Sequence, residues 1–164
     1  MSSIFGVYSE IRNAERAVNE LKQREVTSNS ISIIVKRGVI NSYLSRYDNW
    51  PHFSSQVTIR RATIIDLMAL LLGVGARRLS DIGATIITGF LSVPFDGLDK
   101  GFVDVLSDIG VPEPVAKNCR QAVRNHNVVL AISADDQMDD VYNILQETEA
   151  EMVHKVEMST FEDN

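Results

Sequence analysis

The sequence predicts an α+β fold, namely a ferredoxin-like duplicated βαβ arrangement with a four-stranded antiparallel sheet and a large helical insertion between strands 2 and 3. Two observations lead to this prediction. The order strand, helix, strand occurs near the N-terminus and again near the C-terminus, and a long apolar stretch of different character separates the two copies. We expect one domain over residues 1–164, consisting of a first βαβ unit (1–37), a mainly helical apolar insertion (38–127), a second βαβ unit (128–158) and a flexible tail (159–164).

The first unit begins with strand-forming residues at positions 4–8. After Ser9, apolar residues recur with the spacing of one helix face. A turn cluster at 28–30 then leads into a second apolar strand at 31–35. The buried face of the helix is expected to consist of Ala14, Ala17, Val18 and Leu21.

The second unit repeats this order, with a strand at 128–133, a helix and a final strand at 152–158. Asp135 or Asp136 is expected to cap the helix, because an Asp side chain can accept hydrogen bonds from the first free N–H groups. The helix would bury Val141, Leu145 and Met138. Alternation in the final strand places Met152, His154, Val156 and Met158 on one face.

The insertion contains two apolar segments, at 62–76 and 82–93, which together predict an apolar helical pair. A helix that is apolar on every side is normally buried. The rest of the chain, a second subunit or a membrane surface could each provide this burial. A third helix is expected after Pro112, with Val115, Ala116, Cys119, Ala122 and Val123 on its apolar face.

Composition narrows the classes of function. The 164 residues are 45% hydrophobic and 23% charged, which is typical of a globular protein. The net charge of −6 argues against nucleic-acid binding, which needs clustered positive charge. The single cysteine, Cys119, excludes an internal disulfide and fits a cytoplasmic protein. The longest uncharged run, 82–95, is shorter than a membrane span, and the first residues lack the pattern of a secretory signal.

Several motifs resemble one known family. They are the opening Phe5-Gly6-Val7-Tyr8 before residues 14–21, the strand at 31–35, a Gly-containing apolar middle, the stretch 106–112 with Gly110 and Pro112, and residues 128–134 followed by Asp135-Asp136. In these the chain resembles the bacterial heat-induced general stress protein family, often labelled YflT-like, over nearly its whole length. The resemblance implies a stress-associated protein and supplies no catalytic residue or cofactor. The chain differs from the family in its aromatic stretch at 43–53 and in a middle with less Gly and Ala.

No catalytic, metal or cofactor site is predicted. His52, His126 and His154 lie in three different elements without the spacing of metal ligands. Cys119 lies on an apolar helix face with no adjacent base, so packing explains it better than nucleophilic chemistry. We therefore expect that the protein is not an enzyme and carries no cofactor.

The leading hypothesis is a non-catalytic, cytoplasmic, stress-associated protein that forms homo-oligomers through its apolar insertion. The predicted assembly interface comprises Leu67, Leu70, Leu71, Ile86, Ile87, Phe90 and Leu91. One alternative is a peripheral membrane protein whose apolar hairpin lies in the lipid interface. Its lipid contacts would be Arg60, Arg61, Arg77 and Arg78. Another alternative is a small-ligand regulatory domain that uses the sheet and the aromatic stretch 43–53 as a pocket, for a ligand of unknown identity.

Overall fold

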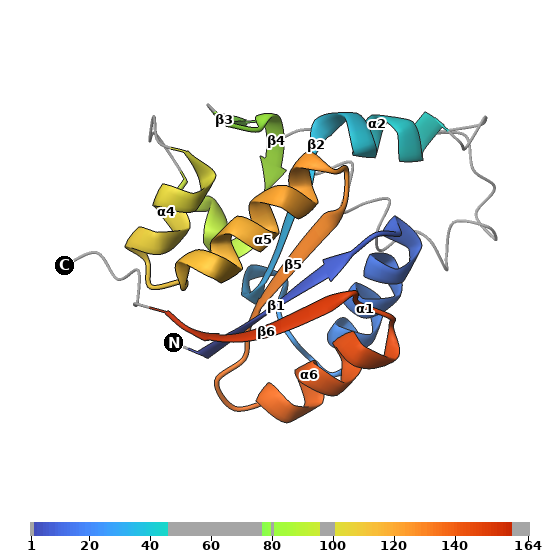
Figure 1. Cartoon of the computed structure of the whole chain (residues 1–164). Coiled ribbons are helices and arrows are strands. Elements are labelled where there is room, and N and C mark those ends of the chain that lie inside the picture. Colours follow the sequence, from blue (N-terminus) through green and yellow to red (C-terminus); the bar gives the residue numbers. More distant parts are fainter. Residues whose placement is uncertain (1, 46–76, 80, 96–100, 159–164) are drawn as a thin grey trace.

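The centre of the computed structural model is a six-stranded sheet with the strand order β3-β4-β2-β5-β1-β6 (Figure 1). The structure describes residues 2–45, 77–79, 81–95 and 101–158. The strands are β1 (Ser2–Tyr8), β2 (Ile31–Lys36), β3 (Arg77–Leu79), β4 (Gly83–Ile87), β5 (Val128–Ser133) and β6 (Met152–Glu157). The helices are α1 (Ile11–Gln23), α2 (Arg37–Ser45), α4 (Phe102–Asp108), α5 (Glu113–Arg124) and α6 (Met138–Glu147), with short 3-10 helices η1 (Ser28–Ser30) and η2 (Gly89–Ser92).

All neighbouring strands are antiparallel, which confirms the predicted α+β class with an antiparallel sheet. The predicted number of four strands is wrong. Two strands of the insertion, β3 and β4, join the sheet beyond β2. Without them β2 would be an edge strand with unpaired backbone groups. β4 pairs with these groups of β2, in the register from Ile34↔Ile87 to Lys36↔Thr85.

Both predicted strand-helix-strand segments are present. β1 and β2 each pair antiparallel with β5, so they run parallel to each other, with α1 between them in the chain. β5 and β6 each pair antiparallel with β1 and are likewise parallel, with α6 between them. The buried side of α1 consists of the four residues that the periodicity predicted: Ala14, Ala17, Val18 and Leu21.

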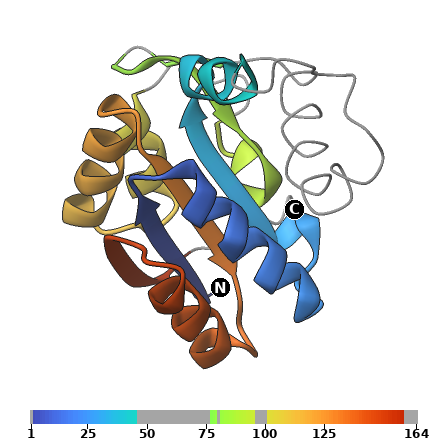
Figure 2. The ribbon, with the colours of Figure 1, turned by 90° about the vertical axis from the view of Figure 1, so that its right-hand side faces the viewer.

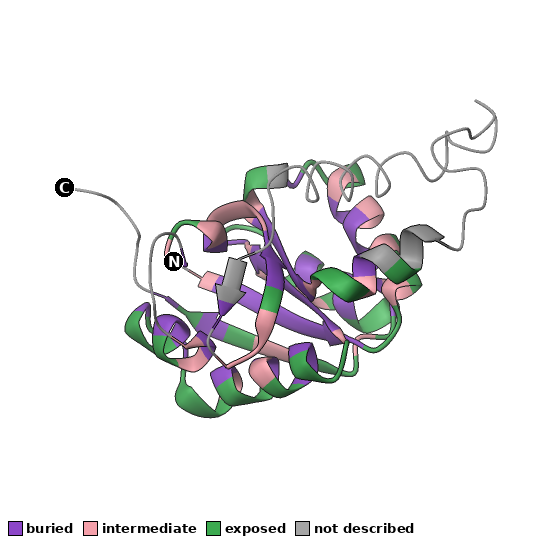
Figure 3. Cartoon of the chain, turned by 90° about the horizontal axis from the view of Figure 1, so that it is seen from above, coloured by how far each residue is buried: buried purple, intermediate pink, exposed green. Residues whose placement is uncertain are grey.

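One face of the sheet packs against α1 and α6. This first core joins the buried sides of these helices to alternate strand residues such as Ile4, Ile33 and Leu130, and Ile40 of α2 extends it. Figure 2 shows the sheet between its helices, and Figure 3 shows that its central strands are buried while the outer helix surfaces are exposed. Because strand side chains alternate between faces, the neighbouring residues of each strand must be covered separately.

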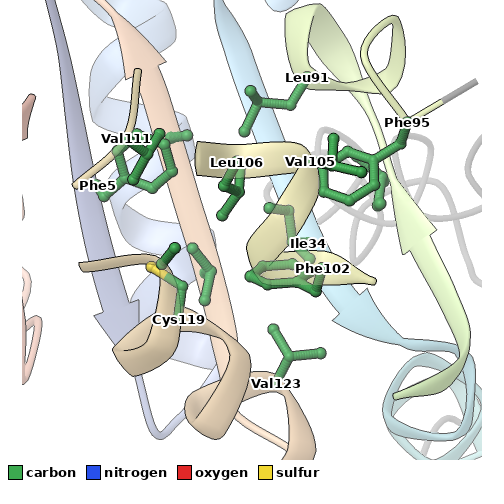
Figure 4. Packing of buried hydrophobic residues seen from close by; sticks show 14 of the residues in the cluster. Phe5, Ile34, Leu91, Phe95, Phe102, Val105, Leu106, Val111, Cys119 and Val123 are labelled. Carbon is green, nitrogen blue, oxygen red and sulfur yellow. The ribbon is translucent and has the colours of Figure 1, made fainter. Parts of the chain in front are cut away.

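The opposite face packs against α4, α5 and η2. Figure 4 shows Phe5, Ile34 and Phe102 in this second core, with Cys119 and Val123 of α5 beside them. The α5 residues predicted to be buried are buried, except that Val115 is half-buried. The insertion therefore supplies the helical layer that covers this second face.

The predicted helix over 82–93 is wrong. The segment forms β4, Thr88 and then η2, so its apolar residues fall on different sides of the sheet. Ile86 packs into the first core and Ile87 into the second. The physical reason lies in four consecutive β-branched residues, 85–88, which favour a strand. They lie between Gly83 and Gly89, whose positive φ angles occur at the first residues of β4 and η2.

The predicted cap of α6 is also wrong. The helix starts at Met138 and its N-cap residue is Gln137, without a side-chain hydrogen bond. Asp135 instead accepts a hydrogen bond from the backbone N–H of Ser2, at 2.6 Å between Oδ1 and N. This acidic side chain therefore ties the start of β1 to the end of β5.

Two titratable side chains lie in the cores. The hydroxyl of Tyr8 is hydrogen-bonded to Oγ1 of Thr148 at 2.8 Å, and burial raises the pKa of Tyr8 to about 12. Burial in the second core raises the pKa of the Cys119 thiol to about 12 as well. Both groups are therefore neutral in the folded protein near neutral pH, so the Cys119 thiol is not activated as a nucleophile.

These two pKa shifts predict a loss of stability in alkali. The ordinary pKa values of the Cys119 thiol and the Tyr8 hydroxyl, 9.0 and 10.0, apply when the chain is unfolded, whereas both pKa values are about 12 when it is folded. Their contribution is complete below pH 9 and is lost as the pH rises to about 12, on the order of 4 kcal/mol for Cys119 and roughly 2–3 kcal/mol for Tyr8. Urea unfolding between pH 8 and 11, repeated on Cys119→Ala and Tyr8→Phe, should show a shallower pH dependence in each variant. An unchanged dependence would contradict the prediction.

Candidate functional site

A half-open cavity of about 780 Å³ lies at one end of the sheet. Its walls come from the segment after β1, from α2 directly after β2, and from the start of β5. β1 and β2 run parallel and β5 runs antiparallel to both, so the ends of the first two strands and the beginning of the third meet at the same edge of the sheet. The fold itself therefore brings these three segments together.

The first wall is the junction between β1 and α1. Ser9, Glu10, Ile11 and Arg12 all line the cavity. Glu10 is the N-cap residue of α1 in an extended conformation, and its carbonyl oxygen accepts the N–H groups of residues 13 and 14 at 3.1 and 3.3 Å. The N–H groups of Ile11 and Arg12 precede these first hydrogen bonds, so the helix provides no acceptor for them.

The second wall is one side of α2. Gly38, Val39 and Ser42 line the cavity, and their spacing of three and four residues places them on one face of the helix. β2 continues into α2 without a loop, so the position of this wall is fixed by the sheet. A Cβ atom added at Gly38 would meet nothing within 4 Å, which shows that this residue borders open space.

The third wall is the connection from α5 to β5. His126 has a positive φ of 68°, and the N–H of Asn127 returns to the carbonyl oxygen of Ala122 at 2.9 Å, so the chain turns sharply after the helix. Val128, which also lines the cavity, pairs with Tyr8 across the sheet. The turn thus places His126 at the cavity, close to the end of β1.

The cavity combines several kinds of polar group with an apolar surface. The lining residues include the ionisable residues Arg12, Glu10 and His126 and the hydroxyl-bearing residues Ser9 and Ser42. The apolar part of the lining comes from Ile11, Val39 and Val128. A volume of this size and a lining of a few polar groups beside aliphatic side chains are typical of sites for small organic molecules. In the described residues, His, Cys, Asp and Glu form no group of three that could hold a metal ion.

The described residues of the predicted assembly interface do not form an exposed surface. Leu67, Leu70 and Leu71 lie outside the described residues. Ile86, Ile87 and Leu91 are only 1%, 2% and 0% exposed within a single chain, and Phe90 is half-buried against the second core. These three buried residues cannot contact a second subunit in this fold, because the two cores of the chain itself enclose them.

The residues of the predicted lipid contact are only partly described. Arg60 and Arg61 lie outside the described residues, whereas Arg77 and Arg78 belong to β3 and pair with Thr85 and Ala84 of β4. Of the aromatic stretch 43–53, the structure describes only the part within α2. Among the described helices, none has both the length and the apolar character needed to cross a bilayer.

Sequence reasoning missed the cavity. Its residues come from three separate segments, and the spacing of histidines tests only His126 among them as a site residue, for metal binding. A signal was present nonetheless, because the first βαβ unit implies parallel strands whose ends share one sheet edge. The residues directly after those two strands, Ser9 to Arg12 and Gly38 to Ser42, could have been predicted to lie close together.

Comparison with known proteins gives no relative from which a function could be transferred. No protein-family model, no curated protein and no solved structure matches the chain. The resemblance to the general stress protein family stays a prediction from sequence motifs. The geometry of the cavity is therefore the main basis for a functional proposal.

Proposed function

We propose that this protein is a non-catalytic domain that binds a small polar molecule in the cavity between the start of α1, the first turns of α2 and the start of β5. The observation that carries this proposal is the cavity of about 780 Å³, in which charged and hydroxyl groups lie beside aliphatic side chains. The Cys119 thiol, a candidate nucleophile, is buried in the second core with a raised pKa, which favours binding over nucleophilic catalysis by this group.

We infer that β2, β5, β1 and β6, together with α1 and α6, are a ferredoxin-like unit to which β4 and β3 have been added. The adjacent order β2-β5-β1-β6 supports this inference, and so does the packing of both helices into the same core. The helices α4 and α5 then form an additional layer on the other face.

The position of the cavity supports a regulatory role. Gly38, Val39 and Ser42 belong to α2, the first element of the insertion, whereas Ser9 and Arg12 belong to the first βαβ unit. A ligand that contacts both walls would stabilise α2 in its position on the sheet by binding the folded form. Ligand binding in the cavity would in this way change the stability of the first helix of the insertion.

Other parts of the proposal come from the sequence. A stress-associated role follows from the family resemblance, and a cytoplasmic location from the single cysteine. Self-association through the apolar insertion loses support from Ile86, Ile87 and Leu91, because these residues are buried within the chain.

The cavity can be tested with a substitution that fills it. The thermal stability of the protein is measured with nucleotides, amino acids, organic acids and sugar phosphates, and each compound that raises the melting temperature is followed by calorimetry. A ligand at about 100 times its Kd should stabilise the fold by roughly 2.7 kcal/mol. In Gly38→Phe, the ring should occupy the open space beside Gly38 and remove this stabilisation.

Gly38→Ala is the matched control. It adds only a methyl group in open space and should stabilise α2 by about 0.5–1 kcal/mol through its higher helix propensity, while ligand binding is retained. If a compound stabilises Gly38→Phe as much as the unchanged protein, it binds elsewhere and the cavity is not the site.

A further inference from the structure

The outer edge of β6 is an open edge of the sheet. β6 is the last strand in the order, and within the described part of the chain no strand pairs with its outer side. Figure 1 shows β6 running along one side of the sheet next to β1. Such an edge presents a row of backbone N–H and C=O groups that another strand can bind.

The hydrogen-bond pattern of β1 shows which β6 residues turn these groups outward. The carbonyl oxygen of Ser2 accepts the N–H of Ala134 at 3.0 Å, beyond the end of β5, and that of Val7 accepts the N–H of Glu151 at 2.8 Å, beside β6. Since backbone groups alternate between the two neighbours of a strand, even-numbered residues of β1 bond toward β5 and odd-numbered residues toward β6.

The register then assigns each residue of β6 to one side. The odd-numbered residues Ser3, Phe5 and Val7 lie opposite Val156, His154 and Met152. Those three β6 residues therefore turn their backbone groups toward β1. The residues between them turn theirs toward the open edge, and they are Val153, Lys155 and Glu157.

We propose that a second copy of this chain pairs antiparallel with this edge, in the register that places Lys155 opposite Glu157 of the partner subunit. In this register the two-fold axis passes through Val156, so each protomer contributes one Lys155 and one Glu157 to two equivalent pairs. Both residues have outward backbone groups, so each pair also exchanges two N–H···O hydrogen bonds. The edge is thus complementary to itself in charge and in hydrogen bonding.

Charge disfavours two neighbouring registers in which outward groups meet. An axis through Lys155 would place the two lysines opposite each other. An axis through His154 would place Glu157 opposite Glu151 of the partner subunit. Like charges directly opposite each other destabilise a strand pair, whereas opposite charges stabilise it. A third register, with the axis through Val153, would place Lys155 opposite Glu151 of the partner subunit, but the N–H of Glu151 is already bonded to the carbonyl oxygen of Val7. A two-fold axis that passes between two neighbouring residues would place residues with outward N–H and C=O groups opposite residues whose groups point inward. These backbone groups could then not form hydrogen bonds.

Each of the two charged side chains already has a contact within the chain. Nζ of Lys155 lies 4.8 Å from the centre of the Tyr142 ring of α6, and a carboxylate oxygen of Glu157 accepts a hydrogen bond from the hydroxyl of Ser2. Lys155 and Glu157 are both exposed and lie on the same face of the sheet. This arrangement reduces the conformational entropy that pairing would cost.

The test combines charge reversal with mass measurement. Sedimentation velocity over about a hundredfold range of concentration should show the 18.3 kDa chain in equilibrium with a species of twice that mass. Lys155→Glu and Glu157→Lys, tested separately, should each raise the dimer Kd at least ~10-fold, because both pairs become repulsive. The double variant Lys155→Glu/Glu157→Lys exchanges the charges and should restore the Kd to within about threefold of the original.

Two matched controls change the net charge equally at other exposed sites, namely Lys117→Glu on α5 and Glu147→Lys at the end of α6. They should leave the Kd unchanged. Amide hydrogen exchange gives a second readout, since dimerisation should slow exchange at residues 155 and 157, whose N–H groups point outward. A strict monomer, a dimer insensitive to the Lys155 and Glu157 reversals, or a dimer without protection of these amides would overturn the proposal.

Discussion

Replacing Gly89 with alanine is expected to destabilise the protein by about 4–5 kcal/mol or more, a large effect for a single methyl group. Gly89 has a φ of +67°, and a Cβ atom there would lie 2.1 Å from the carbonyl oxygen of Ile31 and 2.8 Å from its carbonyl carbon. These are backbone atoms of β2, which cannot rotate away. The methyl group would force η2 away from the sheet.

The loss of stability would extend beyond Gly89, because the contact between residues 88–91 and β2 also contains several hydrogen bonds. The N–H of Thr88 bonds to the carbonyl oxygen of Ile33 at 3.1 Å, and its hydroxyl accepts the N–H of Ile33 at 3.0 Å. The N–H of Leu91 bonds to the hydroxyl of Ser32 at 3.0 Å. Moving Gly89 by the distance that a methyl group requires would break these contacts and displace the buried Leu91 side chain.

Gly83→Ala is the matched comparison for urea unfolding. Gly83 also has a positive φ, of +103°, but an added Cβ would meet nothing within 4 Å. Its substitution should cost only the backbone strain, about 1–2 kcal/mol. If both variants lose the same free energy of unfolding, the close approach of Gly89 to the backbone of Ile31 does not explain the effect of its substitution.

Truncating Phe102 should also be severe, with an expected loss of about 3–5 kcal/mol for Phe102→Ala. The side chain is fully buried in the second core, and its ring centre lies 5.6 Å from that of Phe95. Figure 4 shows it beside Val105 and Val123, so its removal leaves a cavity lined by two helices. Chemical denaturation measures the loss.

Phe102→Leu separates cavity formation from other effects at this helix start. The N–H of Phe102 bonds to both carboxylate oxygens of Asp81, at 3.1 and 3.2 Å, and neither substitution removes this backbone contact. Leucine restores most of the apolar volume, so its cost should stay near 1–2 kcal/mol. Equal losses for alanine and leucine would show that packing volume is not the cause.

The sequence was most informative where apolar residues recur with the clear spacing of a helix or of a strand. The helical spacing of Ala14, Ala17, Val18 and Leu21 and the alternation of Val156 and Met158 against Val153 describe faces that the structure also buries. Long-range pairing was not accessible in the same way. That β4 adds beside β2 depends on a contact between residues about fifty positions apart, and no local period encodes it.

The segment 82–93 shows why an apolar run is ambiguous. Hydrophobicity alone fits a buried strand as well as a buried helix, and strand propensity decides between them. Four consecutive residues are β-branched and favour a strand, namely Thr85, Ile86, Ile87 and Thr88. The helix prediction rested instead on the length and apolar character of the whole segment. The cavity was missed for a different reason, because it exists only after the ends of β1, β2 and β5 have been brought to one edge.

The position of β1 between β5 and β6 has a consequence for synthesis of the chain. Its partners are β5 and β6, which are contributed by residues 128–157. Until residues 128–157 have left the ribosome, β1 has no native neighbour on either side. Many of its contacts span more than 120 positions, so folding closes its largest loop last and proceeds slowly. During that interval the apolar residues at positions 4–8 depend on chaperones or on non-native contacts for protection from aggregation.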